Sequence, residues 1–190
     1  MLRTRLAVMF IPLFITGAAL ADNPKPAVTD TTESAAKLSE TFSVLQAVNK
    51  WAISVSETAD KKAKSDLVKG YARTVATSNT SFETKLQALA QKHGMDIAPL
   101  DAQTEEGKSV LDRMKGEKEL LGSLEGDAWD KEYMTLVTNT QQSLLHLLEA
   151  NKGSAKDPDV KQFFGDLETN VRNRLKTAQD IMAKIYGDQI

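Results

Sequence analysis

Apolar residues recur every three or four positions along most of the chain, which is the spacing of helices that bury one face. The segments with this spacing, four long and one shorter (105–121), lie over residues 31–62, 65–93, 105–121, 128–151 and 158–186. Gly94 suits the left-handed residue that ends a helix, and Asp157 before Pro158 is typical of a helix start. Strand-like alternation bounded by turn residues does not occur in the sequence, so the pattern predicts an all-α protein.

Each long segment carries one narrow apolar stripe, which must be buried against other helices. The simplest arrangement that buries four such stripes is an antiparallel four-helix bundle. One or two short extra helices then lie between the second and third long helices. Within this arrangement we expect Leu120 to face inward, Asp127 to cap the third long helix, and Asp30 with Glu33 to cap the first.

The N-terminal 21 residues differ from the rest of the chain. A positively charged start precedes a short apolar run, and residues 19–21 have the A-x-A pattern of a cleavage site. We therefore predict a secretory signal peptide over residues 1–21, cut after Ala21, a flexible leader over 22–30 and a single helical domain over 31–190. An uncleaved membrane anchor is the alternative, although no stop-transfer pattern follows. This organisation predicts export to a bacterial periplasm.

The composition removes several classes of function. The 190 residues include no cysteine, which excludes disulfides, thiolate metal sites, a cysteine nucleophile and a lipoprotein anchor. The formal net charge is −2 and both signs are interspersed, so neither a nucleic acid nor an anionic lipid surface is expected as a partner. Beyond the signal peptide, no segment is apolar enough to predict a membrane span.

Candidate catalytic and metal-binding residues are few. A di-iron bundle needs Glu-x-x-His pairs, whereas the sequence has only the reverse, His146 followed by Glu149. His146 shares the polar face of its helix, and His93 lies in a last helical turn, where a cation suits the helix dipole. Because haem-attachment and phosphate-loop motifs are absent, we expect no enzyme and no cofactor. Trp51 and Trp129 are expected to pack at the bundle boundary, with a partner surface as the alternative.

One long segment carries an unusual polar run, "TSNTS" at residues 77–81, in its middle. Asn79 falls on the apolar stripe of this segment, and its polar neighbours face outward or sideways. A buried amide must find hydrogen-bond partners or destabilise the fold. The run is therefore either a functional polar site or a structural replacement for one.

With the helices placed, the chain resembles a family of exported bacterial proteins of unknown function that are often labelled outer membrane proteins. The resemblance covers residues 42–185, and its motifs are "LVKGYA" with "LQALAQKHG" in residues 66–94, "WDKEY" at 129–133 and "RLKTAQDI" at 174–181. It implies a ferritin-like four-helix bundle. It also implies a ligand position on each long helix, a Glu on the first and a His on each of the others.

This sequence departs from the family pattern at all four implied ligand positions. They are occupied by Ser54, Asn79, Gln141 and Arg174. These polar groups bind metals poorly, so the resemblance implies no metal here. We expect them instead to form one hydrogen-bonded layer, with Arg174 donating to the amide oxygens of Asn79 and Gln141. The alternative has Arg174 reaching the surface while the other three are satisfied locally.

These features together predict an exported periplasmic protein without catalytic activity that interacts with other envelope components. Its partner would be an unknown envelope protein or a small ligand. One alternative is a binding module for a small apolar ligand or peptide held between the helices. A second alternative is a ferritin-like metalloprotein with degenerate ligands.

Overall fold

The computed structural model describes residues 29–151, 153 and 155–187, with side chains from residue 36 onward. Within these residues the chain forms α1 (Thr29–Ser56), α2 (Ala59–Lys62), α3 (Asp66–Lys92), α4 (Glu105–Ser123), α5 (Gly126–Asn151) and α6 (Pro158–Tyr186). No strand occurs in this part of the chain, so the predicted all-α class is confirmed. The predicted signal peptide with its cleavage point at Ala21, almost all of the leader, and the side chains of Asp30 and Glu33 lie outside the described residues.

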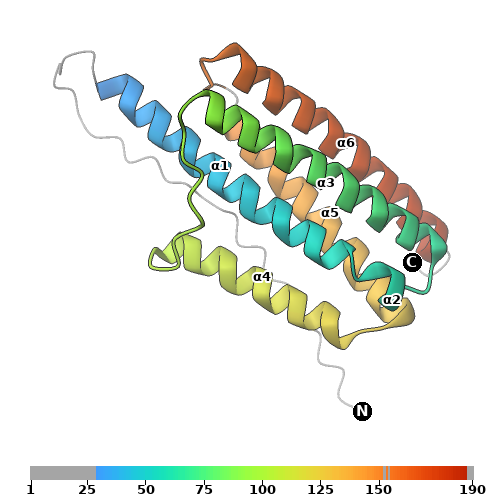
Figure 1. Ribbon diagram of the computed structural model, residues 1–190. Helices are drawn as coiled ribbons and strands as arrows, with labels where there is room; N and C mark the ends of the chain where they lie inside the picture. Colours follow the sequence, from blue (N-terminus) through green and yellow to red (C-terminus); the bar gives the residue numbers. More distant parts are fainter. Residues whose placement is uncertain (1–28, 152, 154, 188–190) are drawn as a thin grey trace.

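The helices pack as a bundle around a shared core (Figure 1). α1 lies against α3, α3 against α6, and α6 against α5. α4 lies on the outside of this group, where it contacts α1 and α5 (Figure 1). The predicted extra helix between the second and third long helices is α4, whereas the short α2 follows α1.

Two helix ends form as the sequence predicts. At the end of α3, Gly94 takes a φ of 61°, the Gly94 N–H bonds the Gln91 carbonyl, and the Met95 N–H bonds the Ala90 carbonyl at 2.9 Å. This is a Schellman motif, which requires a left-handed residue at the position of Gly94. At the start of α6, Asp157 Oδ1 accepts from the backbone N–H of Asp159 at 2.8 Å, so Asp157 is the N-cap.

The first helix ends earlier in the structure than the sequence predicts. It was expected to reach residue 62, but α1 ends at Ser56 and α2 begins at Ala59. The Thr58 hydroxyl donates to the Val55 carbonyl at 2.7 Å, and the Thr58 N–H bonds the same carbonyl at 3.2 Å. A threonine that bonds nearby backbone in this way competes with the regular helical ladder.

Two local predictions are wrong. Asp127 does not cap α5, because the helix already begins at Gly126. Gly126 has a φ of 61°, and the chain turns there from the end of α4 into α5. Leu120 is 44% exposed, and Leu121, at 2%, faces inward instead. Leu121 lies seven residues after Met114 on α4, and this two-turn spacing places both on the buried face.

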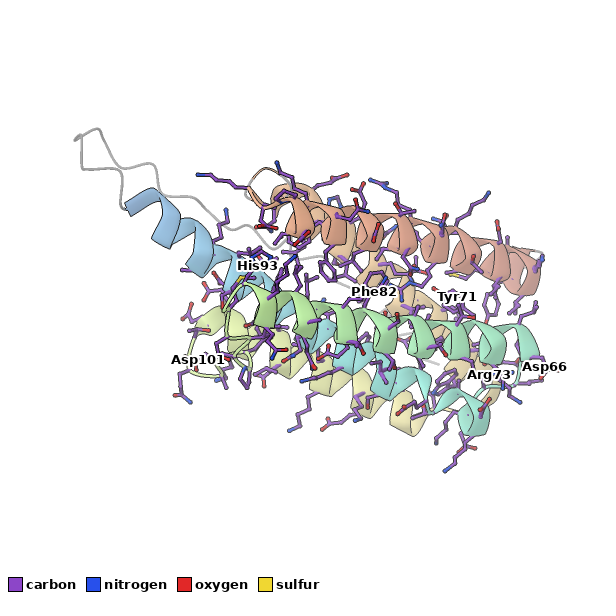
Figure 2. All side chains as sticks on the ribbon, turned by 45° about the horizontal axis from the view of Figure 1, so that its top comes forward. Asp66, Tyr71, Arg73, Phe82, His93 and Asp101 are labelled. Atoms are coloured by element: carbon purple, nitrogen blue, oxygen red, sulfur yellow. The ribbon has the colours of Figure 1, made fainter. Side chains whose placement is uncertain are left out.

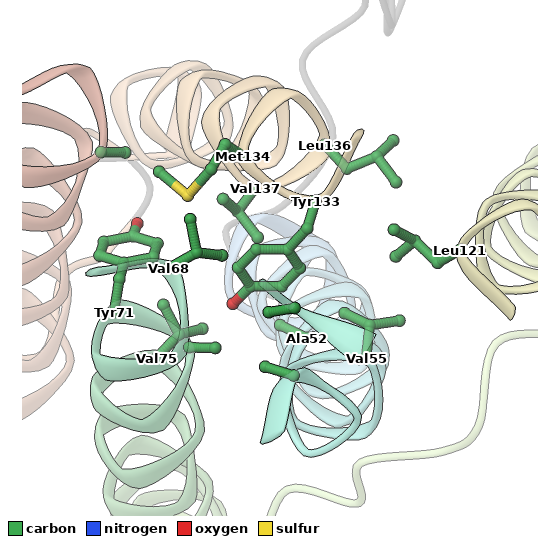
Figure 3. Close-up of a cluster of buried hydrophobic side chains, with 14 of the residues drawn as sticks. Ala52, Val55, Val68, Tyr71, Val75, Leu121, Tyr133, Met134, Leu136 and Val137 are labelled. Carbon is green, nitrogen blue, oxygen red and sulfur yellow. The ribbon is translucent and has the colours of Figure 1, made fainter. Parts of the chain in front are cut away.

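The buried core has two parts. We call one the tyrosine half; its four aromatic residues are Trp51, Tyr71, Trp129 and Tyr133. Figure 3 shows Tyr133 of this half reaching from α5 towards α1, beside Ala52 and Val55. We call the other the phenylalanine half; its four aromatic residues are Phe42, Phe82, Phe163 and Phe164. Tyr71 and Phe82, from different halves, both lie on the side of α3 that faces α6 (Figure 2).

Candidate functional site

A buried polar layer separates the two halves of the core. On α3, Asn79 follows Val75 of the tyrosine half and precedes Phe82 of the phenylalanine half. On α6, Arg174 likewise lies between residues of the two halves, and only 7% of it is exposed. Arg174 Nη1 donates to Asn79 Oδ1 at 2.5 Å and to the Ser78 hydroxyl at 3.1 Å. The structure therefore places Arg174 in the bundle interior, against the polar run of α3.

Gln141 reaches this layer through Tyr71. Gln141, on α5, is 4% exposed, and its Nε2 donates to the Tyr71 hydroxyl at 2.5 Å. The Tyr71 hydroxyl in turn donates to the backbone carbonyl of Arg174 at 3.3 Å. A direct bond from Arg174 to the Gln141 amide oxygen is not found among the described residues. The Tyr71 phenol therefore joins the Gln141 side chain to the backbone of Arg174.

Ser54 lies apart from the other three predicted residues. It is half-buried, and its hydroxyl accepts from Lys118 Nζ of α4 at 2.7 Å. The contribution of α1 comes from Asn49, whose Nδ2 donates to the Asn79 carbonyl at 2.7 Å and to Glu83 Oε2 at 3.4 Å. Asn49 stands four residues after Leu45 and three before Ala52. That spacing is the one sequence signal that could have found it.

Burial governs the ionisation of this layer. It lowers the pKa of Arg174, and the phenols of Tyr71 and Tyr133 offset this effect in part. Burial also raises the pKa of Tyr71, while the hydrogen bond from Gln141 and the charge of Arg174 act in the opposite direction. The phenol therefore stays neutral near pH 7. Two buried atoms of the layer, Arg174 Nε and Gln141 Oε1, have no hydrogen-bond partner among the described residues.

Both tryptophans are buried rather than exposed to a partner. Trp51 is 8% exposed, and its Nε1 donates to the Met114 carbonyl of α4 at 3.1 Å. Trp129 is fully buried, and its ring stacks on Tyr133 with centroids 4.7 Å apart. The alternative of a partner surface at these tryptophans is therefore wrong.

The "WDKEY" motif has a structural role that sequence reasoning missed. Its first and last residues, Trp129 and Tyr133, form the stacked pair at the start of α5. Its carboxylate, Asp130, is 1% exposed and accepts from the backbone N–H of Lys64 at 3.2 Å and of Ser65 at 2.8 Å. The buried carboxylate thus satisfies donors where the chain enters α3, which ties α5 to α3.

One cluster outside the layer has residues of the metal-binding type. His93, Asp157 and Asp159 offer ligand atoms that lie within 4.8 Å of one another, where α3 ends and α6 begins. Asp157 Oδ1 already accepts the cap bonds of α6, and Asp159 Oδ2 pairs with Lys92. His146 is exposed, as expected. The sequence did not indicate this cluster, because its histidine and its aspartates are 64 and 66 residues apart.

The model of a domain of unknown function, DUF4142, matches residues 23–181 and so includes the whole polar layer. The chain belongs to the DUF4142 family. The expected membership of a bacterial family of unknown function is thereby confirmed. No curated protein matches this DUF4142 chain.

A solved structure shares the fold of this DUF4142 protein. It is a DUF305 protein from Streptomyces coelicolor that is described as secreted. The TM-score is 0.63 at 12% identity, and the match covers 77% of this chain and 92% of that chain. At this identity the likeness concerns the fold alone.

Among the described residues, no helix has the length and apolar character needed to cross a membrane.

Proposed function

We propose that this DUF4142 protein is exported to the periplasm and acts there without catalysis, as an interaction protein of the bacterial envelope. Its N-terminal sequence and the secreted DUF305 neighbour support export. We also propose that α1, α3, α5 and α6 form an antiparallel, ferritin-like four-helix bundle, with α4 in the crossover from α3 to α5. The packing of α3 between α1 and α6, and of α6 against α5, supports this arrangement.

The content of the polar layer is the observation that carries the non-catalytic proposal. Where the family resemblance implies metal ligands on α3, α5 and α6, this chain has Asn79, Gln141 and Arg174. Arg174 donates to Asn79, and Gln141 donates to Tyr71, so all three side chains form hydrogen bonds inside the bundle. Guanidinium and amide groups do not act as general bases near neutral pH. The layer is thus suited to holding helices together.

In-cell crosslinking of the epitope-tagged protein, followed by purification of the envelope fraction, tests this proposal. We expect one reproducible envelope partner. The double substitution Leu67→Lys and Leu120→Lys is expected to reduce capture, because these are the large exposed apolar residues of the described chain. Arg172→Gln, at an exposed position, is the matched control and should leave capture unchanged.

Metal analysis of protein purified from its own periplasm tests the opposite outcome. Stoichiometric iron or manganese that is lost on substitution of Asn79 or Gln141 would overturn the non-catalytic proposal in favour of a metalloprotein. Metal that is lost only in His93→Gln would belong to the cluster at the α3–α6 end, and the polar layer would keep its proposed role.

A second candidate function is the binding of a small apolar ligand. A depression of about 310 Å³ between α5 and α6 favours it, since this volume reaches the lower limit of small-molecule sites. Leu148 and Phe164 are among its lining residues, beside Gly165. Gly165→Leu should weaken the binding of a fluorescent fatty acid there. Open space surrounds the Cβ position of Gly165, so the leucine side chain can be accommodated and would occupy part of the depression. Gly116→Leu on α4, which also has open space, is the control, and equal binding by both variants would contradict this function.

A further inference from the structure

The guanidinium of Arg174 is a buried cation without a carboxylate partner. Its side-chain hydrogen bonds within the described residues go to two neutral oxygens, of Asn79 and Ser78. In the part of the chain that the structure describes, no carboxylate bonds to it or pairs with it. The phenols of Tyr71 and Tyr133 that act on it electrostatically are themselves neutral near pH 7, because burial raises the pKa of both. An uncompensated buried charge is costly, so the site favours an anion.

The two residues that carry the unpartnered atoms of the layer also line a cavity. Arg174 Nε and Gln141 Oε1 are buried and have no hydrogen-bond partner among the described residues, and both residues line a partly enclosed space of about 30 Å³ between the helices. This space accommodates about two or three water-sized groups. Turning the Gln141 amide over would let Oε1 accept the Tyr71 proton, which would then leave its 3.3 Å bond to the Arg174 carbonyl, and would place the NH₂ group where Oε1 now lies. The cavity can therefore present donors from both Arg174 and Gln141.

We propose that the cavity beside Arg174 binds one small monovalent anion, of the size of chloride or formate. The anion accepts from Arg174 Nε and from the turned amide of Gln141. Its charge neutralises the guanidinium inside the bundle. The small volume of the cavity favours small anions, and the apolar lining from residues such as Val75, Val137 and Leu144 disfavours multivalent ones. The site lies inside the bundle, so it goes beyond the proposed partner binding and does not depend on it.

A water molecule is the competing occupant. It could accept from Arg174 Nε and donate to Gln141 Oε1 without any change of the amide. Water would satisfy both atoms but would leave the positive charge uncompensated. The two occupants therefore differ in one measurable property, which is the response of stability to small anions at constant ionic strength.

Thermal unfolding in mixtures of sodium gluconate and sodium chloride, bromide or formate tests the proposal. The purified protein is kept at one pH and one ionic strength while the small anion replaces gluconate. For a dissociation constant of about 10 mM, we expect Tm to rise by about 3–5 °C at 100 mM anion, and the rise should follow the logarithm of the anion concentration above the dissociation constant. Arg174→Met should abolish the rise. Arg172→Gln, an exposed arginine two residues away that pairs with Glu168, should retain it.

Bromide provides a readout on the wild-type protein, which does not depend on the folding of a variant. In crystals grown with bromide, we expect an anomalous scattering peak within hydrogen-bond distance of Arg174 Nε. In solution, bromide NMR lines should broaden with the wild-type protein and sharpen again on addition of formate. Equal Tm values in gluconate and chloride would overturn the proposal. So would a water in the cavity with bromide found only at surface sites.

Discussion

The phenylalanine half of the core packs four rings against one another, whereas every aromatic ring of the tyrosine half carries a polar atom. Phe163 contacts Phe42, Phe82 and Phe164 with ring centroids 6.0–6.1 Å apart. In the tyrosine half, the Trp51 indole donates to a backbone carbonyl, and the hydroxyls of Tyr133 and Ser56 lie 2.8 Å apart. Volume therefore dominates one half, while the other also depends on directional bonds.

The polar layer lies at the boundary between these two kinds of packing. Arg174 and Asn79 close the phenylalanine half on one side, and Tyr71 with Gln141 connects the layer to the tyrosine half. A polar network of this kind permits few alternative arrangements, because each donor needs its own acceptor. We infer that the layer sets the alignment of α3, α5 and α6. The phenylalanine half stabilises the bundle by burying apolar surface and does not select one alignment in this way.

The largest effect is expected from opening a cavity in the phenylalanine half. Phe42 is fully buried against Phe163 and Phe164. Phe42→Ala should lower the free energy of unfolding by about 3–5 kcal/mol, as is typical of buried phenylalanines. Urea denaturation measures this loss. Leu120→Ala, at an exposed apolar position, is the control and should change the value by less than about 0.5 kcal/mol. Similar losses in both variants would show that the half is not tightly packed.

The next effect should come from breaking the polar layer. Asn79→Leu removes one of the two acceptors of Arg174 Nη1 and leaves a buried charge with fewer bonds, which should cost about 1.5–3 kcal/mol. Removal of both partners, in Asn79→Leu with Arg174→Met, should cost less than the single change, because no charge remains buried. A double-mutant cycle from denaturant curves measures the coupling. Additive effects would mean that the contact does not couple α3 to α6.

Of the two halves of the core, the tyrosine half is the one whose side chains titrate at alkaline pH. Burial raises the folded-state pKa of Tyr71 and Tyr133 above the unfolded value of about 10. Their contribution to stability is thus fully present below pH 10 and is lost as pH rises through the folded values. In that window each buried phenol should lower stability by about 1.4 kcal/mol per pH unit. Tyr133→Phe should flatten this dependence, as measured by urea denaturation at successive pH values, and an unchanged slope would contradict it. Phe163→Leu, in the other half, is the control and should leave the slope as it is.

The sequence predicts most of the helices because each one carries its own local signal. Gly94 provides the left-handed residue that follows α3, and Asp157 provides the side-chain acceptor that caps α6. The C-terminal end of α3 and the start of α6 were therefore predictable. The break after Ser56 was not, because apolar spacing continues through Ala59 and a threonine bond interrupts the helix without changing that spacing. Leu120 and Leu121 are adjacent leucines, and packing against α1 and α5 decides which of them is buried.

The polar layer was only half predictable, for a physical reason. A stripe shows that Asn79, Gln141 and Arg174 face inward, but not which atoms meet, since this depends on the relative rotation and shift of three helices. The sequence did not indicate that Tyr71 belongs to the polar layer, because a tyrosine on an apolar stripe is ordinarily assigned to the apolar core. The cluster of His93, Asp157 and Asp159 likewise exists only because α3 ends where α6 begins.

The smallest expected difference in stability is between variants of two α1 residues. Ser54 was expected in the polar layer, whereas the structure places Asn49 there. Ser54→Ala removes a hydroxyl that bonds the exposed Lys118, so stability should change by less than about 0.5 kcal/mol. Asn49→Ala removes the donor to the Asn79 carbonyl, and this should cost about 0.5–1.5 kcal/mol. Urea denaturation of the two variants side by side measures the difference. A larger loss for Ser54→Ala than for Asn49→Ala would place Ser54 in the layer after all, and the α1 side of the boundary between the two halves would have to be redrawn.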